Sequence, residues 1–109
     1  MTAVDPIWIA KTVLLETSWV LRSRYSFEES AIADAFTKLL GLDDVDVEDE
    51  SSVVDALDLA ARGIELADAL HLASRPPGAA FVSFDRSLVR QAKRAGASDV
   101  AELADRKQR

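Results

Sequence analysis

The stretch AAFVSFDRSLVRQAKRAG, residues 79–96, decides the fold class of this chain. Its first part is apolar and rich in residues that favour strands, which predicts a strand over 80–84. Asp85 then stands where an N-cap belongs, and helical spacing over 86–95 continues until Gly96. A strand that leads through an aspartate into a helix is typical of α/β folds with parallel strands.

The same alternation of short apolar runs and helical patterns continues through the rest of the chain. A capping box of Ser26 and Glu29 predicts the start of a helix that ends before Gly41, and Gly63 is expected to stop another. We predict further helices over 12–24, 49–62 and 66–74, and short strands over 7–9, 45–47 and 100–103. The pattern indicates one α/β domain over residues 1–109 with a mostly parallel sheet, and we expect 105–109 to be a frayed basic tail.

Composition excludes several classes of protein. The chain has 109 residues, of which 49% are hydrophobic and 29% charged, as in globular domains and unlike disordered segments. It contains no cysteine, and therefore neither a disulfide nor a thiolate metal site. No signal peptide or membrane-spanning run is recognisable, so we expect a cytoplasmic protein without a membrane partner. The net charge of −6 argues against binding to nucleic acid by bulk charge, but not against contact through metal ions and a local basic face.

Three acidic residues are the candidate site, and each also has an ordinary explanation. Glu16 has apolar neighbours one turn away on either side, so it faces the packed side or reaches solvent at its margin. Asp68 lies in the first turn of its helix, where an acidic residue stabilises the helix dipole. Asp85 is placed both as an N-cap and at the carboxyl end of a strand, where open α/β sheets bind ligands. Spacing alone does not show that the three residues meet.

The chemistry of such a site would be that of hard divalent cations. Mg²⁺ and Mn²⁺ bind carboxylate and water oxygens, and two such ions can activate water and stabilise the leaving oxygen of a phosphodiester. This chemistry needs about four acidic groups from distant parts of the chain.

Three segments in order resemble the PIN-domain family. They are KTVLLETSWVLRSRYSFEESAI (11–32), VDVEDESSVVDALDLAARGIELADALHLA (45–73) and AAFVSFDRSLVRQAKRAGASDV (79–100). The likeness is greatest to the VapC toxins of VapBC toxin–antitoxin modules. It implies a three-layer α/β/α PIN-like fold with a central, mostly parallel sheet. It also implies a Mg²⁺- or Mn²⁺-dependent endoribonuclease that cuts RNA until a VapB-like antitoxin blocks it.

The resemblance assigns the metal-binding and catalytic positions to Glu16, Asp68 and Asp85. Ser83, where the family usually has Thr, would support the site. The family opens with a strand ending in Asp-Thr-Asn that carries a further acidic ligand, and nothing in residues 1–109 matches it. We therefore expect either a truncated or degenerate family member or a sequence whose start has been placed too late, with the missing strand encoded by the upstream codons. In both cases we expect residues 1–109 alone to have little or no activity. The alternative is a non-catalytic remnant that binds an antitoxin or a second copy of itself.

The remaining candidate residues concern partners. Arg86 and Arg90 begin a basic stripe that also includes Lys93 and Arg94. This stripe either contacts RNA phosphates or is an ordinary solvated helix face. His71, the only histidine, shares a helix face with Asp68 and is either a packed residue or a metal ligand. Trp8 and Trp19 are expected to anchor the core or an interface. A sheet that lacks a strand has an uncovered edge, so we also expect a homodimer or a larger species.

Overall fold

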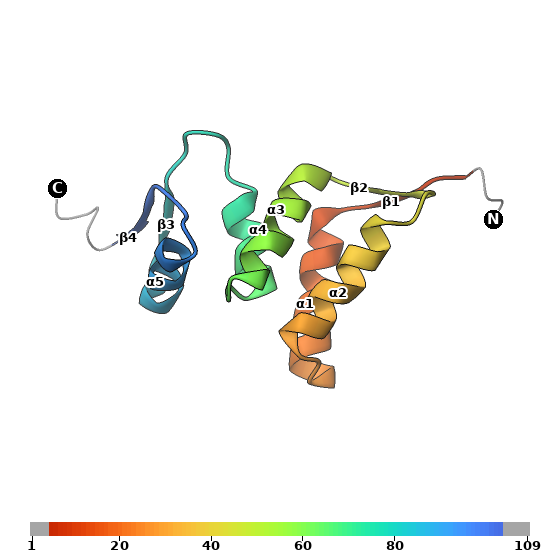
Figure 1. Ribbon diagram of the computed structural model, residues 1–109, viewed down its shortest axis with the longest axis horizontal. Helices are drawn as coiled ribbons and strands as arrows, with labels where there is room; N and C mark the ends of the chain where they lie inside the picture. The colour runs from red at the N-terminus through yellow and green to blue at the C-terminus, as the bar shows by residue number, and fades with distance from the viewer. Residues whose placement is uncertain (1–4, 104–109) are drawn as a thin grey trace.

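The computed structural model describes residues 5–103, so the predicted tail at 105–109 lies outside the described part. The chain is an α/β protein in which short strands alternate with helices (Figure 1). In chain order its elements are β1 (Ile7–Ile9), α1 (Lys11–Tyr25), α2 (Glu29–Leu40), β2 (Val45–Val47), α3 (Glu50–Ala61), α4 (Leu66–Ala73), β3 (Phe81–Ser83), α5 (Arg86–Arg94) and β4 (Val100–Glu102). Every element predicted from the sequence is present, with bounds that differ by a few residues at most.

The helix ends follow local chemistry where the sequence provides it. The Asp85 side chain accepts a hydrogen bond of 3.1 Å from the backbone N–H of Leu88 and caps α5, as predicted. Gly63 follows α3 with φ +103°, and Gly96 follows α5 with φ +95°. Residues that carry a side chain rarely adopt this left-handed backbone conformation, so glycine at these two positions ends each helix without strain.

The predicted capping box at the start of α2 is wrong. Ser26 ends α1 in a left-handed conformation with φ 56°, whereas an N-cap residue needs extended backbone. Glu28 takes the N-cap position of α2 and makes no side-chain cap hydrogen bond. The Glu29 carboxylate instead pairs with Arg22 of α1 and accepts a hydrogen bond from the backbone N–H of Leu66 in α4. These contacts replace the hydrogen bond that a capping box would make at the start of α2.

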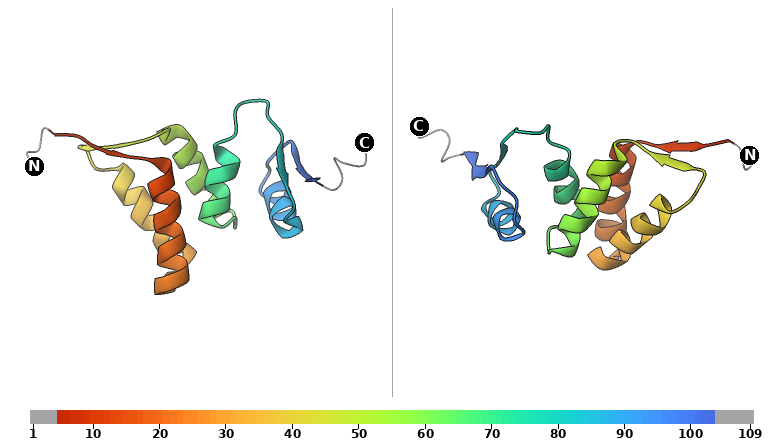
Figure 2. Two further views of the ribbon diagram at one scale, coloured as in Figure 1. Left: turned by 180° about the vertical axis from the view of Figure 1, so that it is seen from behind. Right: turned by 45° about the horizontal axis from the view of Figure 1, so that its top comes forward.

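The strands form two separate parallel pairs among residues 5–103. β1 pairs with β2, with Trp8 opposite Asp46, and β3 pairs with β4, with Val82 opposite Ala101. The expectation of one central sheet is therefore not met within the described residues. The physical reason is visible in Figures 1 and 2, where the two pairs lie toward opposite ends of the molecule with α3 and α4 between them.

One hydrophobic core nevertheless runs along the row of helices. α3 packs against α4, α4 against α1, and α2 against α1 and α3. At the far end α5 packs on β3 and β4, and its Leu88 and Val89 are buried in the same apolar cluster as Leu66 of α4. Two arginine side chains also connect the α3 and α4 region to the segment between α5 and β4. Arg62 donates to the carbonyl of Ala95 at 2.8 Å, and Arg75 donates to the carbonyl of Asp99 at 3.1 Å.

Within residues 5–103, each strand pair leaves backbone groups at an edge that no other strand covers. The Ile7 N–H donates to Asp44 and the Ile9 carbonyl accepts from Glu48, so these residues face β2. In a parallel strand the backbone N–H and C=O groups of successive residues point toward opposite edges, so those of Trp8 point away from β2. By the same pattern Phe81 donates to Asp99 of the β4 side, and the backbone groups of Val82 face the open edge of β3.

Candidate functional site

Asp68 and Asp85 line one cavity, although the rest of α4 and the whole of β3 lie between them in the chain. The cavity has a volume of about 370 Å³. Its polar lining residues come from α1, α2, α4 and the start of α5, and they are Arg22, Glu29, Glu65, Asp68, Asp85, Ser87 and Gln91. Two of the three acidic residues predicted from the sequence are thus brought together.

The turn between β3 and α5 holds Asp85 in place. The Ser83 hydroxyl accepts a hydrogen bond of 3.0 Å from the backbone N–H of Asp85. One oxygen of the Asp85 carboxylate caps α5 through Leu88, and the carboxylate lies at the carboxyl end of β3. Ser83 therefore supports the backbone of Asp85 directly, and the second carboxylate oxygen of Asp85 is not needed for the cap.

Asp68 lies in an environment that disfavours its charge. Partial burial raises the pKa of Asp68 above its ordinary value, and the negative charge of Asp85 raises it further. The positive charges nearby, His71 and Arg22, act in the opposite direction but do not cancel the shift. Burial is the larger of these causes, so Asp68 is not a helix-dipole residue on an open surface.

Glu16 is not part of this cavity. Its side chain is exposed on α1, on the same side as Val13 and Trp19, which are 51% and 54% exposed. The sequence left two placements open for Glu16, and the structure has the solvent-facing one. The structure therefore does not bring Glu16 to Asp68 and Asp85.

Three residues of the cavity were not identified as site residues from the sequence. Arg22 of α1 donates to the Glu65 carboxylate at 2.7 Å and lies 3.4 Å from the Glu29 carboxylate. Glu29 in turn accepts from the backbone N–H of Leu66 at 3.1 Å. Burial raises the pKa of Glu65, with Arg22 opposing that shift and Asp68 adding to it. Nothing in the spacing of these residues indicates the contact, because each partner lies on a different helix.

The acidic residues do not fit a bound Mg²⁺ or Mn²⁺ in this arrangement. Within residues 5–103, no three carboxylate or imidazole side chains lie close enough together to hold a metal ion. The cavity contains four carboxylates, but the Arg22 guanidinium is paired with two of them. A divalent ion needs several oxygen ligands converging on one point, and here a protein cation takes part of that set.

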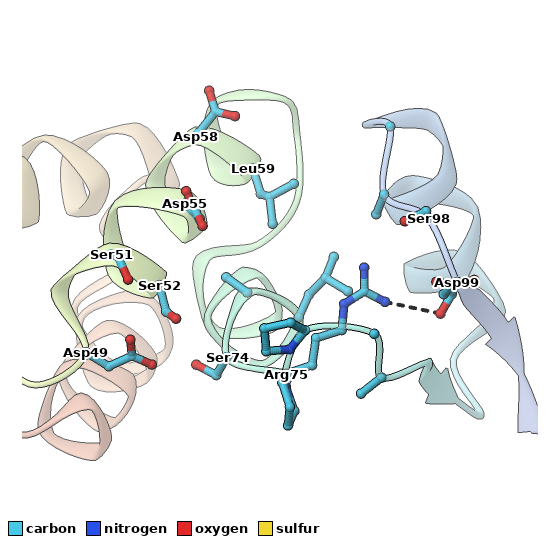
Figure 3. Close-up of a pocket in the computed structure, with 18 residues that line it drawn as sticks. Asp49, Ser51, Ser52, Asp55, Asp58, Leu59, Ser74, Arg75, Ser98 and Asp99 are labelled. Carbon is cyan, nitrogen blue, oxygen red and sulfur yellow. Dashed lines mark hydrogen bonds between the residues drawn. The ribbon is translucent and has the colours of Figure 1, made fainter.

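A second, larger cavity of about 770 Å³ contains none of the predicted site residues. Figure 3 shows it between α3, the loop after α4 and the segment before β4. Asp49, Asp55 and Asp58 line one side, and Arg75 reaches across to the Asp99 carbonyl. On the rim Lys11 pairs with Asp49 at 2.8 Å and donates to Ser74 at 3.0 Å. Asp49, Ser74 and Arg75 of its lining are thus already engaged in hydrogen bonds.

The candidate residues for partner contact lie on the surface. Arg86 is exposed and 3.4 Å from the Glu102 carboxylate, and Arg90 is exposed on the same helix. His71 is also exposed, so it is not a packed core histidine. Trp8 and Trp19 are 64% and 54% exposed, which rules out a core role and leaves the interface role as a prediction.

Comparison with protein-family models, with curated proteins and with solved structures found no match to this chain. No helix within residues 5–103 is both long and apolar enough to cross a membrane.

Proposed function

We propose that this chain is a VapC-like PIN-type domain whose acidic centre, Asp68 with Asp85, is that of a metal-dependent endoribonuclease, incomplete in the arrangement described. One observation carries the proposal. Asp68 of α4 and Asp85, which follows β3, share a cavity, and the charge of Asp85 raises the pKa of Asp68. Carboxylates whose pKa values are perturbed by burial and by a neighbouring charge within a cavity are candidates for a functional site. RNA is the proposed substrate, Mg²⁺ or Mn²⁺ the proposed cofactor and a VapB-like protein the proposed antitoxin.

A cleavage assay tests this proposal. Residues 1–109, stripped of metal, are incubated with single-stranded RNA and Mn²⁺ or Mg²⁺. We expect weak cleavage at most, because the acidic residues do not fit a bound metal ion in this arrangement, and any metal-dependent cleavage should disappear in both Asp68→Asn and Asp85→Asn. Asp55→Asn, which removes a carboxylate from the other cavity, is the matched control and should cleave like the unchanged chain. Cleavage that survives both substitutions would contradict the proposal, and complete inactivity with excess Mn²⁺ would favour the non-catalytic alternative.

A second candidate function is association without catalysis, favoured by the open strand edges. The backbone groups of Trp8 and Val82 face edges that no other strand of residues 5–103 pairs with, and such edges accept strands from other chains. Each pair also carries an exposed aromatic side chain, since Trp8 of β1 is 64% exposed and Phe84, which follows β3, is 76% exposed. Exposed aromatics next to an edge are typical of an interface with a second copy or an antitoxin.

A further inference from the structure

The charged residues on the exposed face of α5 are all cations. Arg86, Arg90, Lys93 and Arg94 are exposed, and the helix contains no acidic residue. Residues three or four positions apart are neighbours on a helix surface, so Arg90 lies beside the other three, and like charges at that spacing are destabilising. Only Arg86 of this set forms an ion pair within residues 5–103, with Glu102 at 3.4 Å. The other three cations of α5 therefore repel one another without an ion-pair partner in the described part of the chain.

The stretch 43–50 has the opposite charge. It contains no basic residue and six acidic ones, namely Asp43, Asp44, Asp46, Glu48, Asp49 and Glu50. Two of these are engaged by Lys11, whose side chain pairs with Asp49 at 2.8 Å and whose backbone N–H donates to Glu48 at 2.9 Å. Asp43 and Asp46 are exposed and form no ion pair within residues 5–103. This surface also repels itself within a single chain.

Exposed apolar side chains accompany both surfaces. Trp8 lies opposite Asp46 in the register of β1 and β2, and both side chains are exposed. Leu42, which precedes the acidic stretch, is 52% exposed, and Phe84, two residues before α5, is 76% exposed. An arginine or lysine that reaches a tryptophan ring among carboxylates is attracted by the ring as well as by the charges. Each surface thus offers apolar contact area next to its charges.

The two surfaces lie toward opposite ends of the molecule. Figures 1 and 2 show α5 at one end and β2 toward the other, with α3 and α4 between them, so the surfaces do not meet within one chain. A second copy offers each surface a partner of opposite charge. RNA would satisfy only the cations of α5 and would be repelled by the stretch 43–50.

Resting on the second candidate function proposed above, we infer that the cationic face of α5 docks on the acidic stretch 43–50 of a second copy of this chain. The net charge of −6 opposes association in general, so the attraction is local to these two surfaces. Exposed charges are screened by salt. Self-association should therefore weaken as the salt concentration rises, whereas association by apolar contact alone should not.

The test reverses each surface separately and then mixes the two variants. One variant carries Arg90→Glu with Lys93→Glu, and the other carries Asp43→Lys with Asp46→Lys. Sedimentation velocity measures association at about 0.05 M and about 1 M NaCl. At the lower salt concentration we expect each variant alone to have a dissociation constant at least about tenfold higher than that of the unchanged chain. An equal mixture should associate again, because each variant retains the surface that the other has lost.

Two further sets of variants serve as controls. Arg24→Glu with Lys38→Glu changes the net charge as much as the reversal on α5 does, but at exposed positions on α1 and α2, and should associate like the unchanged chain. Circular dichroism shows whether each variant is folded. If a reversal does not fold, Arg90→Gln with Lys93→Gln and Asp43→Asn with Asp46→Asn replace the two variants, and their mixture should also restore association.

Three results would overturn the inference. The first is association of both reversal variants at the strength of the unchanged chain, which would leave self-association standing and place it on another surface. The second is a mixture that associates no better than its components. The third is a reversal on α5 that abolishes binding of a fluorescent single-stranded RNA and leaves self-association unchanged, because RNA would then be the partner of α5. A monomeric unchanged chain would remove self-association altogether.

RNA cleavage is scored separately from association. Restored association in the mixture, without cleavage by any variant, would uphold the inference and count against the proposed ribonuclease.

Discussion

The Glu29 carboxylate of α2 accepts a 3.1 Å hydrogen bond from the backbone N–H of Leu66, the first residue of α4. The first N–H groups of a helix have no partner within the helix, and the N-cap residue of α4, Glu65, makes no side-chain cap hydrogen bond. A side chain from a distant helix thus performs the capping that the local sequence does not supply. Because Glu29 also pairs with Arg22, the start of α4 and the acidic cavity are held by the same carboxylate.

Removing this long-range cap should destabilise the domain. Glu29→Ala is expected to lower the free energy of unfolding by about 1 kcal/mol, as loss of other helix caps does. Glu29→Gln should cost clearly less, since its amide oxygen still accepts from Leu66. Urea unfolding followed by circular dichroism measures both, with Glu28→Ala, at an exposed position without a cap hydrogen bond, as the control. Equal losses for Glu29→Ala and Glu28→Ala would show that the cap contributes nothing.

Neutralising Asp68 should stabilise the domain at neutral pH. The pKa of Asp68 is raised in the folded state, so the folded chain binds the proton more tightly than the unfolded chain does. Stability from this group is therefore fully present below the ordinary aspartate pKa and is lost as the pH rises through the raised value. We expect Asp68→Asn to be more stable than the unchanged chain at pH 7 by about 0.5 kcal/mol, in the range of partly exposed charge pairs.

The pH dependence separates this cause from others. The advantage of Asp68→Asn should shrink as the pH falls through the raised pKa and vanish about one pH unit below the ordinary aspartate pKa, where Asp68 is protonated in both states. Urea unfolding of both chains at several pH values measures the difference. An advantage that stays constant down to low pH would mean that the charge of Asp68 is not the cause.

Asp85 should show separable structural and chemical roles. Asp85→Ala removes the N-cap of α5 and is expected to cost about 1 kcal/mol of unfolding free energy. Asp85→Asn keeps an acceptor for the Leu88 N–H, so its stability should stay within about 0.5 kcal/mol of the unchanged chain. Any metal-dependent cleavage should be lost in both variants. Cleavage retained by the stable Asp85→Asn would reduce Asp85 to a helix cap.

Blocking the open edge of β3 should reduce self-association. The backbone N–H of Val82 points to that edge, and proline at this position has no N–H to offer a second strand. We expect light scattering to find a dimer or larger species for the unchanged chain at tens of micromolar, a concentration set by ordinary interface affinities. Val82→Pro should shift it toward the monomer, and Val82→Thr, which keeps the N–H, should not. A monomeric unchanged chain would contradict the predicted association.

Most of the local structure could be predicted from residues 5–103 alone. Helices and strands were placed by apolar spacing, and α5 was bounded by Asp85 and Gly96, because these signals act between residues a few positions apart. The start of α2 was predicted wrongly for the same reason. Ser26 and Glu29 have the spacing of a capping box, but that spacing carries no information about Arg22 and Leu66, which provide the partners of Glu29.

The candidate site depended on longer-range information. Asp68 and Asp85 could be chosen as candidates from the sequence, yet their sharing of a cavity follows only from the tertiary arrangement that brings α4 near the start of α5. Glu16 illustrates the limit, because its helix was predicted correctly while the face it presents was left open. Side-chain periodicity tells which residues share a face, and only the neighbouring helices decide whether that face is covered.

The sequence by itself thus determined the order, type and ends of most elements, since hydrogen bonding along a helix and turn chemistry are settled over a few residues. Only the tertiary structure decided that the strands form two separate pairs and that Arg22 lies among the carboxylates of the acidic cavity. These features arise from contacts such as that of Arg22 with Glu65, between residues far apart in the chain. The free energy of such contacts depends on how whole helices pack, which no local pattern of residues contains.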